Sequence, residues 1–339
     1  MTTLRTRLSS QWPWAPVVLL VGLLVWLWLS RMAYPFDLEW MEGGMLAHAW
    51  QLVEGRPLYP EPNPDFVPYV YPPGYSATLA ALGSVVGLSM GLGRAVSIVC
   101  SLLAAAALWV GVTRHGGSRL DGGLAAGVYL GCYVSSGAFY DLVRPDAMAV
   151  ALFAWSVVAA LERHRWAPMC SGLLLAAAFV CKHNLAAFGP AMALALALRS
   201  RRDAAIFALA AAGPALALTA LWQWSSSGRY LQYLLEVPGS HPKYWVRAAF
   251  WMPRELGGAL SFSAFGLGCW LVLRGSEGRA HTARWVVLSE LIAPRIALKV
   301  MTSITPLKRP ENTPPEMGNS RNVACSLLAT PSTNSRRML

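Results

Sequence analysis

The sequence predicts an all-α polytopic membrane protein, built as a bundle of about eight to nine transmembrane helices. Of its 339 residues, 55% are hydrophobic and only 13% are charged, which is about half the charged fraction of a typical soluble domain. Apolar runs long enough to cross a bilayer recur along the chain. The 15 Trp and 11 Tyr residues suit the aromatic belts that lie at membrane surfaces.

The apolar stretches that would form these helices are rich in Ala, Gly and Leu, as closely packed membrane helices often are. They cover residues 14–30, 75–92, 95–113, 122–139, 146–161, 167–181, 185–198, 204–222 and 257–273. The first stretch is too long for a signal peptide, and no small-x-small cleavage site precedes Arg31, so we interpret it as an uncleaved span. Two longer polar segments, 31–73 and 223–256, interrupt the series and predict two large outer loops.

Arginine clusters between the apolar stretches predict the orientation of the helices, because short loops rich in Lys and Arg stay in the cytoplasm. The clusters are Arg5 with Arg7, Arg114 with Arg119, Arg163 with Arg165, Arg199 with Arg201 and Arg202, and Arg274 with Arg279 and Arg284. Residues 31–73, 140–145, 182–184 and 223–256 then face outward. The alternation works only if 75–92 and 95–113 together make one net crossing. One of that pair is therefore predicted to be re-entrant, tilted or interfacial.

The charge and cysteine patterns exclude two classes of protein. The formal net charge of +11 comes from arginines grouped between apolar spans, which does not indicate a nucleic-acid-binding groove. Of the six cysteines, five lie in or beside apolar runs and none forms a CxxC pair, so we expect neither a disulfide framework nor a metal site.

The chain changes character near residue 285, which divides it into a transmembrane domain (1–285) and an atypical tail (286–339). Residues 302–339 are rich in Ser, Thr, Pro, Asn and Arg and lack a helical period, so we expect disorder there. A natural extension, a truncated C-terminal half and a shifted reading frame all remain open as the origin of this tail.

Three carboxylates follow the first span within six residues: Asp37, Glu39 and Glu42. Apolar residues then recur at helical spacing up to Gly55, which predicts a short amphipathic helix in the first outer loop. Asp37 would lie at or before the start of that helix, where its dipole favours an acid. A helix cap needs one acid, so three acids beside a membrane-surface helix indicate a site. Solvation of the loop remains the plain structural interpretation of each acid taken singly.

This loop resembles that of a known enzyme class. Glu42, Gly55, the run Arg56-Pro57-Leu58-Tyr59 and the element Tyr71-Pro72-Pro73 resemble the first outer loop of the GT-C membrane glycosyltransferases, with the protein mannosyltransferase and aminoarabinose transferase group nearest. That resemblance implies a GT-C-like fold and a polyprenyl-phosphate sugar donor. The family pattern has an Asp-Glu pair where this chain has Met41-Glu42, so Asp37 or Glu39 would have to replace the missing Asp.

Two later segments extend the resemblance. Tyr140–Asp146 is similar to the family's Arg…Asp element in a later outer loop, and Cys181-Lys182-His183-Asn184 is a weaker match. The expected orientation puts both on the same side as Asp37. Together the matches cover roughly residues 1–200 and imply a cell-envelope enzyme of the bacterial inner membrane, with its active site facing the periplasm.

The resemblance implies a role for each candidate residue. Asp37, Glu39 or Glu42 would act as general base or orient the acceptor, and Arg144 and Lys182 would contact the donor phosphate. Asp146 would position Arg144 or the sugar. Further substrate contacts would come from Tyr59, Tyr71 and His48, and loop 223–256 could add an aromatic lid from Tyr230, Tyr233, His241, Lys243, Tyr244 and Trp245. The partners would be a polyprenyl-phosphate sugar, membrane lipids and a glycan, lipid or protein acceptor, but no nucleic acid.

Other interpretations remain open at this point. A Mg²⁺ or Mn²⁺ ion bridging acids and phosphate suits a carboxylate cluster, although nothing in the sequence requires one. Arg144 with Asp146 also fits a simple interfacial ion pair, and Lys182 a side chain that snorkels from a helix end. At the level of the whole protein, the alternatives are a lipid or sugar transporter or flippase and an inactive, truncated GT-C relative.

Overall fold

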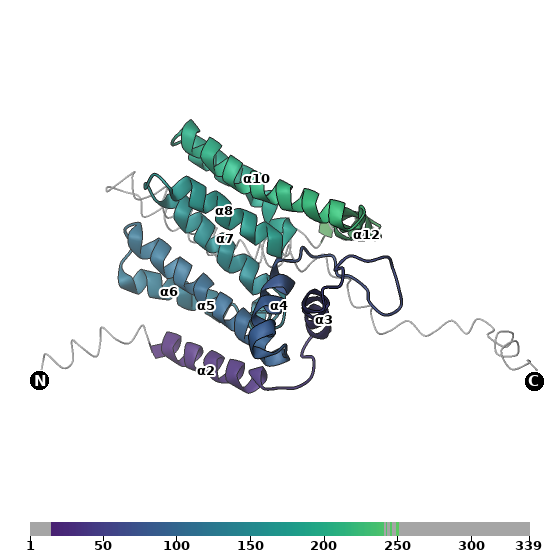
Figure 1. Ribbon diagram of the computed structural model, residues 1–339. Helices are drawn as coiled ribbons and strands as arrows, with labels where there is room; N and C mark the ends of the chain where they lie inside the picture. The colour runs from purple at the N-terminus through teal and green to yellow at the C-terminus, as the bar shows by residue number, and fades with distance from the viewer. Residues whose placement is uncertain (1–14, 241, 243–244, 246–248, 251–339) are drawn as a thin grey trace, which may run out of the picture. The chain divides into compact units, whose positions relative to one another are not determined.

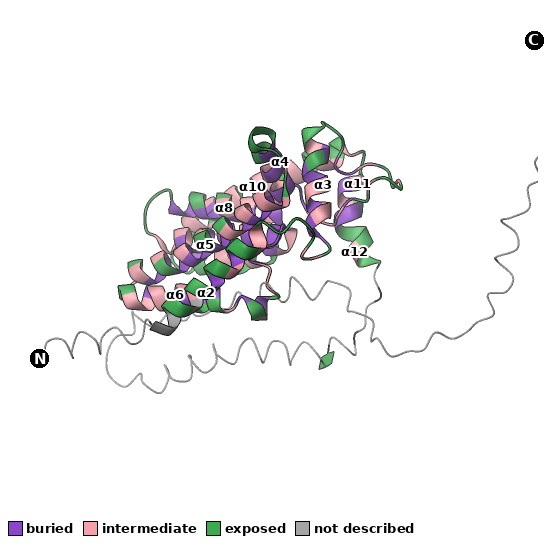
Figure 2. Cartoon of the chain, turned by 90° about the horizontal axis from the view of Figure 1, so that it is seen from below, coloured by how far each residue is buried: buried purple, intermediate pink, exposed green. Residues whose placement is uncertain are grey.

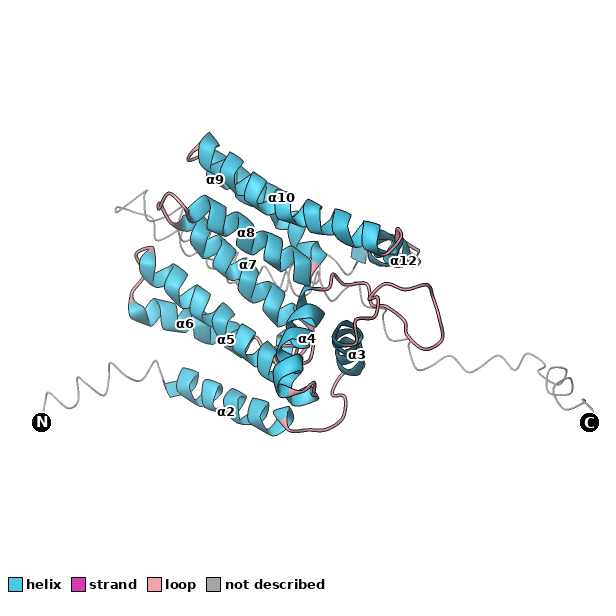
Figure 3. Ribbon diagram, in the orientation of Figure 1, coloured by secondary structure: helices cyan, strands magenta, loops and turns pink. Residues whose placement is uncertain are grey.

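The computed structural model describes residues 15–240, 242, 245 and 249–250, and within them every regular element is helical (Figure 3). All of these residues belong to one compact unit, Met1–Thr302. The predicted span 257–273, the predicted tail 286–339 and the lid candidates His241, Lys243 and Tyr244 lie outside the described residues. The all-α prediction is therefore confirmed for the part of the chain that the structure describes.

The main helices follow the predicted apolar stretches closely. They are α2 (Ala15–Met32), α3 (Glu42–Val53), α4 (Gly74–Val86), α5 (Met90–Arg114), α6 (Arg119–Gly131), α7 (Pro145–Leu161), α8 (Ala167–Cys181), α9 (Gly189–Ala197) and α10 (Arg201–Ser225). Short elements are η2 (Val134–Ser136), η3 (His183–Phe188), α11 (Arg229–Leu231), η4 (Gln232–Glu236) and α12 (Val237–Gly239). The predicted loop helix is confirmed as α3, which ends before Gly55 at a positive φ of 65°.

The long helices lie side by side, with α2, the α5–α6 pair, α7, α8 and α10 following one another across the view in Figure 1. Helix α7 packs between α5 and α8, and α10 packs on the far side of α8. Gly172 permits the close approach of α8 and α10, because a Cβ there would lie 2.5 Å from the Phe207 carbonyl oxygen. Helices α3 and α4 pack together at one end of the row.

Many large apolar side chains are exposed on the outside of this bundle, while several charged side chains are buried within it. Figure 2 shows the exposed and buried positions along each helix. On α10, Leu209 is 75% exposed and Trp224 is 82% exposed, whereas Arg94 and Lys182 are almost fully buried. A soluble protein rarely exposes such a continuous apolar surface, and membrane proteins turn their ionisable groups toward the bundle interior. The burial pattern therefore indicates a membrane protein.

Fewer described helices are long enough to cross a bilayer than the eight to nine predicted spans. Among the described helices, Met90–Arg114 and Arg201–Ser225 are long and apolar enough to span a bilayer, while the other apolar helices are shorter. Helix α4 has 13 residues, so it is about 20 Å long, less than the roughly 30 Å of a hydrocarbon core. Its length fits the member of the 75–113 pair that was predicted not to cross, and the count of eight to nine spans stays a prediction.

The two ends of the bundle differ in charge. At one end, Arg114 pairs with Glu162 at 3.0 Å, and Arg199 donates to the Ala160 carbonyl at 3.2 Å. A cavity of about 330 Å³ opens there, lined by Arg114, His115, Leu161, Glu162, Arg163 and Arg199. Helix α5 runs from this end to Arg94 at the opposite end, where the first outer loop is attached. The arginine clusters of the described residues, around Arg114, Arg163 and Arg199, thus lie at the end of the bundle opposite the acidic loop.

Candidate functional site

Four charged side chains from three distant segments form a continuous row at the end opposite the arginine clusters. Glu39 Oε2 lies 3.0 Å from Arg144 Nη1, and Arg144 Nε donates to Asp146 Oδ2 at 3.1 Å. Lys182 Nζ donates to the other oxygen of Asp146, Oδ1, at 2.6 Å. The structure thus brings together the three segments whose motifs were singled out in the sequence.

Helix ends position these groups. Arg144 precedes α7 in an extended conformation, and Pro145 begins the helix, where its fixed φ is favourable. Asp146 falls in the first turn of α7, at the positive end of the helix dipole. Lys182 is the extended residue that ends α8. The Arg144 guanidinium also lies over the Phe139 ring, 4.2 Å from its centre, in a cation–π contact.

The neighbouring acids keep Arg144 ionised. Burial lowers the pKa of Arg144, but the negative charges of Asp146 and Glu39 and the neighbouring Tyr71 outweigh it, so the net pKa is raised. Next to Lys182, burial and the ammonium charge lower the pKa of His183 to about 4. His183 is therefore neutral at pH 7 and adds no charge to the site.

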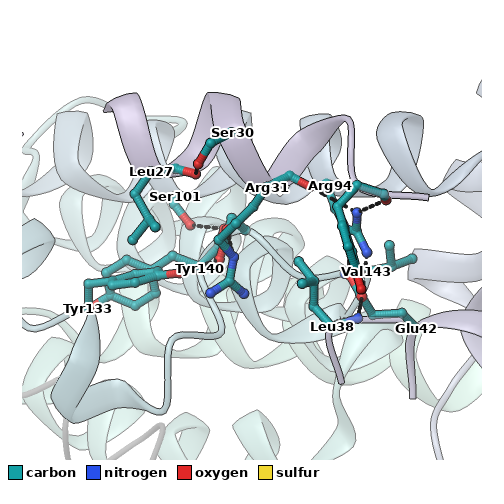
Figure 4. Close-up of polar contacts among 12 residues, drawn as sticks. Leu27, Ser30, Arg31, Leu38, Glu42, Arg94, Ser101, Tyr133, Tyr140 and Val143 are labelled. Atoms are coloured by element: carbon teal, nitrogen blue, oxygen red, sulfur yellow. Dashed lines mark hydrogen bonds and ion pairs between the residues drawn. The ribbon is translucent and has the colours of Figure 1, made fainter. Parts of the chain in front are cut away.

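Glu42 is fully buried and saturated with hydrogen bonds (Figure 4). Arg94 binds it in a two-pronged contact, with Nε donating to Oε1 at 3.0 Å and Nη2 donating to Oε2 at 2.8 Å. The backbone amides of Val143 and Leu38 add one hydrogen bond to each oxygen, at 3.0 and 2.6 Å. Burial raises the pKa of Glu42, but these hydrogen bonds prevail and lower it. Glu42 is thus a fixed carboxylate with both oxygens engaged.

The other two acids of the Asp37, Glu39 and Glu42 group are less buried than Glu42. The helix begins at Glu42, so Glu39 lies in the preceding turn, where its Oε2 also accepts from the Met41 amide at 3.1 Å. Asp37 is exposed, and its carboxylate lies over Gly43 at the start of α3, 3.2 Å from where a Cβ would stand. Burial and the charges of Glu39 and Asp37 raise the pKa of Tyr69, so both acids lie near that ring. Asp37 has no hydrogen bond or ion pair with another described residue.

The other predicted substrate contacts, Tyr59, Tyr71 and His48, bind other residues of the first outer loop. Tyr59 donates through its hydroxyl to the Tyr71 carbonyl at 2.7 Å. The Tyr71 hydroxyl lies 4.0 Å from Met41 Sδ, and burial raises the pKa of Tyr71 to about 12. His48 accepts from the Tyr69 amide at Nε2 (2.7 Å), while its Nδ1 lies 2.6 Å from the Gly44 carbonyl oxygen. Both ring nitrogens of His48 are therefore occupied, with the proton on Nδ1.

Two of the aromatic residues expected in a lid, Tyr230 and Tyr233, are used in packing instead. Tyr230 and Tyr233 are buried against Tyr59, with ring centroids 5.1 and 6.3 Å from it. Tyr233 also donates to the Pro60 carbonyl at 3.2 Å. Trp245 is 74% exposed. The segment after α10, which begins at Ser226 rather than residue 223, thus holds the proline-rich loop in place.

Two arginines at this end of the bundle pair with buried acids, which the sequence did not reveal. Arg94 falls between the predicted spans 75–92 and 95–113, and it lies inside α5. Arg31, at the end of α2, places its Nε 2.8 Å from Asp141 Oδ2 and, as Figure 4 shows, points toward Tyr133. An arginine inside an apolar run is itself a signal of a functional or structural site. Its partner cannot be inferred without the fold.

The described residues contain no group of three or more His, Cys, Asp or Glu side chains placed to hold a metal ion. The buried acids Glu42, Asp141 and Asp146 are each paired with an Arg or Lys. The arrangement is one of alternating acids and bases, which can orient a hydroxyl acceptor and bind a phosphate.

One comparison with known proteins gives a match. The family model described as glycosyltransferase family 87 matches residues 69–301, more than half of the chain. The matched region contains Tyr71, Arg94, Arg144 and Lys182, while the acids at 37–42 precede it. No curated protein and no solved structure matches the chain.

Proposed function

The chain belongs to glycosyltransferase family 87, and we propose that it moves a sugar from a polyprenyl-phosphate donor to an acceptor hydroxyl at the row Glu39–Arg144–Asp146–Lys182. One observation carries this proposal. Glu39 of the first outer loop lies 3.0 Å from Arg144, and Asp146 connects Arg144 to Lys182. Transfer of a glycosyl group needs both, a base for the acceptor and positive charge for the leaving phosphate.

The membrane setting supports an amphiphilic donor. The bundle exposes apolar side chains along α2 and α10, which would lie against lipid or the prenyl chain, while the charged row sits at one end. The arginine clusters around Arg114, Arg163 and Arg199 gather at the other end, as expected for a cytoplasmic face. On this basis the site faces the periplasm of a bacterial inner membrane. The polyprenyl donor itself rests on the resemblance to GT-C enzymes.

Sugar transfer passes through an oxocarbenium-like state in which the bond to the leaving phosphate is largely broken. We assign the general base to Asp37, because of the three acids Asp37, Glu39 and Glu42 it is the exposed one and has no hydrogen bond or ion pair with another described residue. Glu39 orients the acceptor while it is held by Arg144, and Glu42 fixes the turn. Arg144 and Lys182 stabilise the departing phosphate, and Asp146 sets their positions. Acceptor and phosphate on opposite faces of the sugar would give inversion.

Tyr71 and Tyr59 support this arrangement in our proposal, and His48 holds Tyr69 beside the acids. Met41 stands where the family pattern has an Asp, and its side chain is buried against Tyr71. In our proposal the exposed Asp37 therefore acts as the base instead of a residue at position 41. A transporter usually carries ionisable groups near the middle of its spans. Here Asp146 and Lys182 lie at helix ends, which favours chemistry at the membrane surface.

The direct test supplies purified protein in lipid nanodiscs with a radiolabelled polyprenyl-phosphate hexose and a membrane extract as acceptor source. We expect transfer by the wild type and its loss in Asp37→Asn and Glu39→Gln. Asp65→Asn is a matched control, because Asp65 is another exposed acid of the same loop. Unchanged transfer in both site variants would remove the proposed site. An inactive wild type that moves sugar into vesicles without forming a new bond would indicate a transporter.

A further inference from the structure

Arg94 is a fully buried arginine near the start of α5, and every N–H of its guanidinium is engaged by the first outer loop. Two donors bind the carboxylate of Glu42. The others reach the carbonyl oxygens of Arg31 at 2.9 Å, Tyr34 at 2.5 Å and Phe36 at 2.7 Å. A guanidinium has five N–H donors, so none remains for a substrate phosphate.

These acceptors lie along a single segment, from the last turn of α2 to the first residue of α3. The contacts therefore fix the beginning, the middle and the end of the turn that carries Asp37 and Glu39. Figure 4 shows the guanidinium enclosed between the end of α2 and the Leu38–Glu42 turn. An ammonium has three donors and a single point of charge, so a lysine at this place could not make the same set of contacts.

Glu42 extends the connection to the cationic side of the site. Its Oε1 accepts from the Val143 amide at 3.0 Å, and Val143 directly precedes Arg144. The side chain of Val143 packs against Gly93, where an added Cβ would lie 2.6 Å from Val143 Cγ1. The buried Arg94–Glu42 pair thus fixes the position of the acidic turn relative to the loop that supplies Arg144.

We propose that Arg94 is a positioning residue for the transfer reaction: through Glu42 and three backbone carbonyls, it holds the 36–42 turn so that Asp37 and Glu39 face the donor at Arg144. This inference rests on the proposed function for its catalytic consequence. Arg94 touches neither donor nor acceptor. Loosening it displaces the base, while Asp146 still holds Arg144 and Lys182 through its own ion pairs, so the phosphate-binding cations stay in place. Such a change lowers kcat and leaves the KM of the donor unchanged.

The test compares Arg94→Lys with Arg31→Lys in the full chain in nanodiscs. Arg31 is a matched control, because its guanidinium also pairs with a buried acid at the same end of the bundle, yet it binds no carbonyl of the turn. We expect Arg94→Lys to lower kcat about 100-fold, the size of effect that an ångström-scale displacement of a reacting group produces. Donor KM should not change, and Arg31→Lys should keep the wild-type kcat.

Amide hydrogen exchange across residues 33–41 is the second readout, and it needs no substrate. We expect faster exchange there in Arg94→Lys, with α7 and α8 unchanged. If Arg94→Lys does not fold, the double variant Arg94→Gln with Glu42→Gln keeps a neutral pair of similar shape and is measured in the same way. Unchanged exchange in the turn, or faster exchange with wild-type kcat, would overturn the inference. A wild type without transfer would refute the proposed function alone, and exchange would still decide whether Arg94 holds the turn.

Discussion

Lys182 donates to Asp146 at 2.6 Å, and both side chains are almost completely buried at the junction of α7 and α8. The second oxygen of Asp146 accepts from Arg144. Asp146 therefore separates two cations that would otherwise repel each other. Asp146 thus holds Arg144 and Lys182 close together, where both can bind an anion. Each cation is paired with Asp146 before the anion binds.

Replacing Asp146 with Asn should destabilise the protein strongly. The change leaves Arg144 and Lys182 buried without the charge between them, and loss of one partner of a buried ion pair costs about 3–5 kcal/mol. Thermal unfolding in detergent measures the effect. Asp203→Asn is the control, because Asp203 forms a more exposed pair with Arg199 at 3.4 Å, which is worth less than about 1 kcal/mol. Equal shifts in the two variants would contradict the assigned role of Asp146.

Asp37→Asn should abolish most transfer without weakening the fold. Asp37 is exposed and has no partner among the described residues, so its loss removes no internal contact. A positioned general base contributes about 10²- to 10⁴-fold to a rate, and kcat should fall by that amount while the unfolding temperature stays unchanged. A variant that loses stability together with activity would indicate that Asp37 is structural.

The pH dependence of stability should report on Glu42. Its pKa in the folded protein is lowered, so its ionised form adds stability above the pKa of the unfolded chain. This contribution disappears as the pH falls through the folded-state pKa. Unfolding temperatures of the wild type should therefore drop as the pH is lowered below about 4.5, with a shallower drop in Glu42→Gln. Parallel curves for the two proteins would show that Glu42 does not contribute in this way.

Cysteine accessibility should distinguish the two ends of the bundle. Single cysteines at Arg119 and Arg201 are expected to react only after the membrane is permeabilised, while one at Asp65 should react with an impermeant reagent in intact cells. The arginines lie at the basic end of α6 and α10, and Asp65 lies in the first outer loop. Outward labelling at both arginine positions would invert the proposed topology and remove the periplasmic assignment of the site.

Much of the fold was predictable because hydrophobic patterns mark helices directly. The loop helix α3 and its end before Gly55 followed from spacing alone, and the segments containing Glu39, Arg144 and Lys182 were identified by their motifs. The pairings were not predictable. Arg94 lies 52 residues from Glu42 in the sequence. An apolar run with a single arginine does not reveal which residue that arginine contacts.

The same limitation explains why the three acids of the loop looked equivalent in the sequence. Glu42 differs from Asp37 only because Arg94 and the Val143 amide reach it, and both contacts depend on how α5 and the 140–146 loop are placed. Likewise, Tyr230 and Tyr233 resembled a sugar-binding lid because aromatic residues serve both purposes, and their packing on Tyr59 appears only in three dimensions.

The dependence of the acidic turn on α5 has a consequence for biosynthesis. During translation, Glu42 leaves the ribosome 52 residues ahead of the arginine that receives it. The turn therefore lacks its Arg94 contacts until α5 has been synthesised and inserted beside it. A nascent chain halted before residue 94 would carry the acids without the geometry that makes them useful.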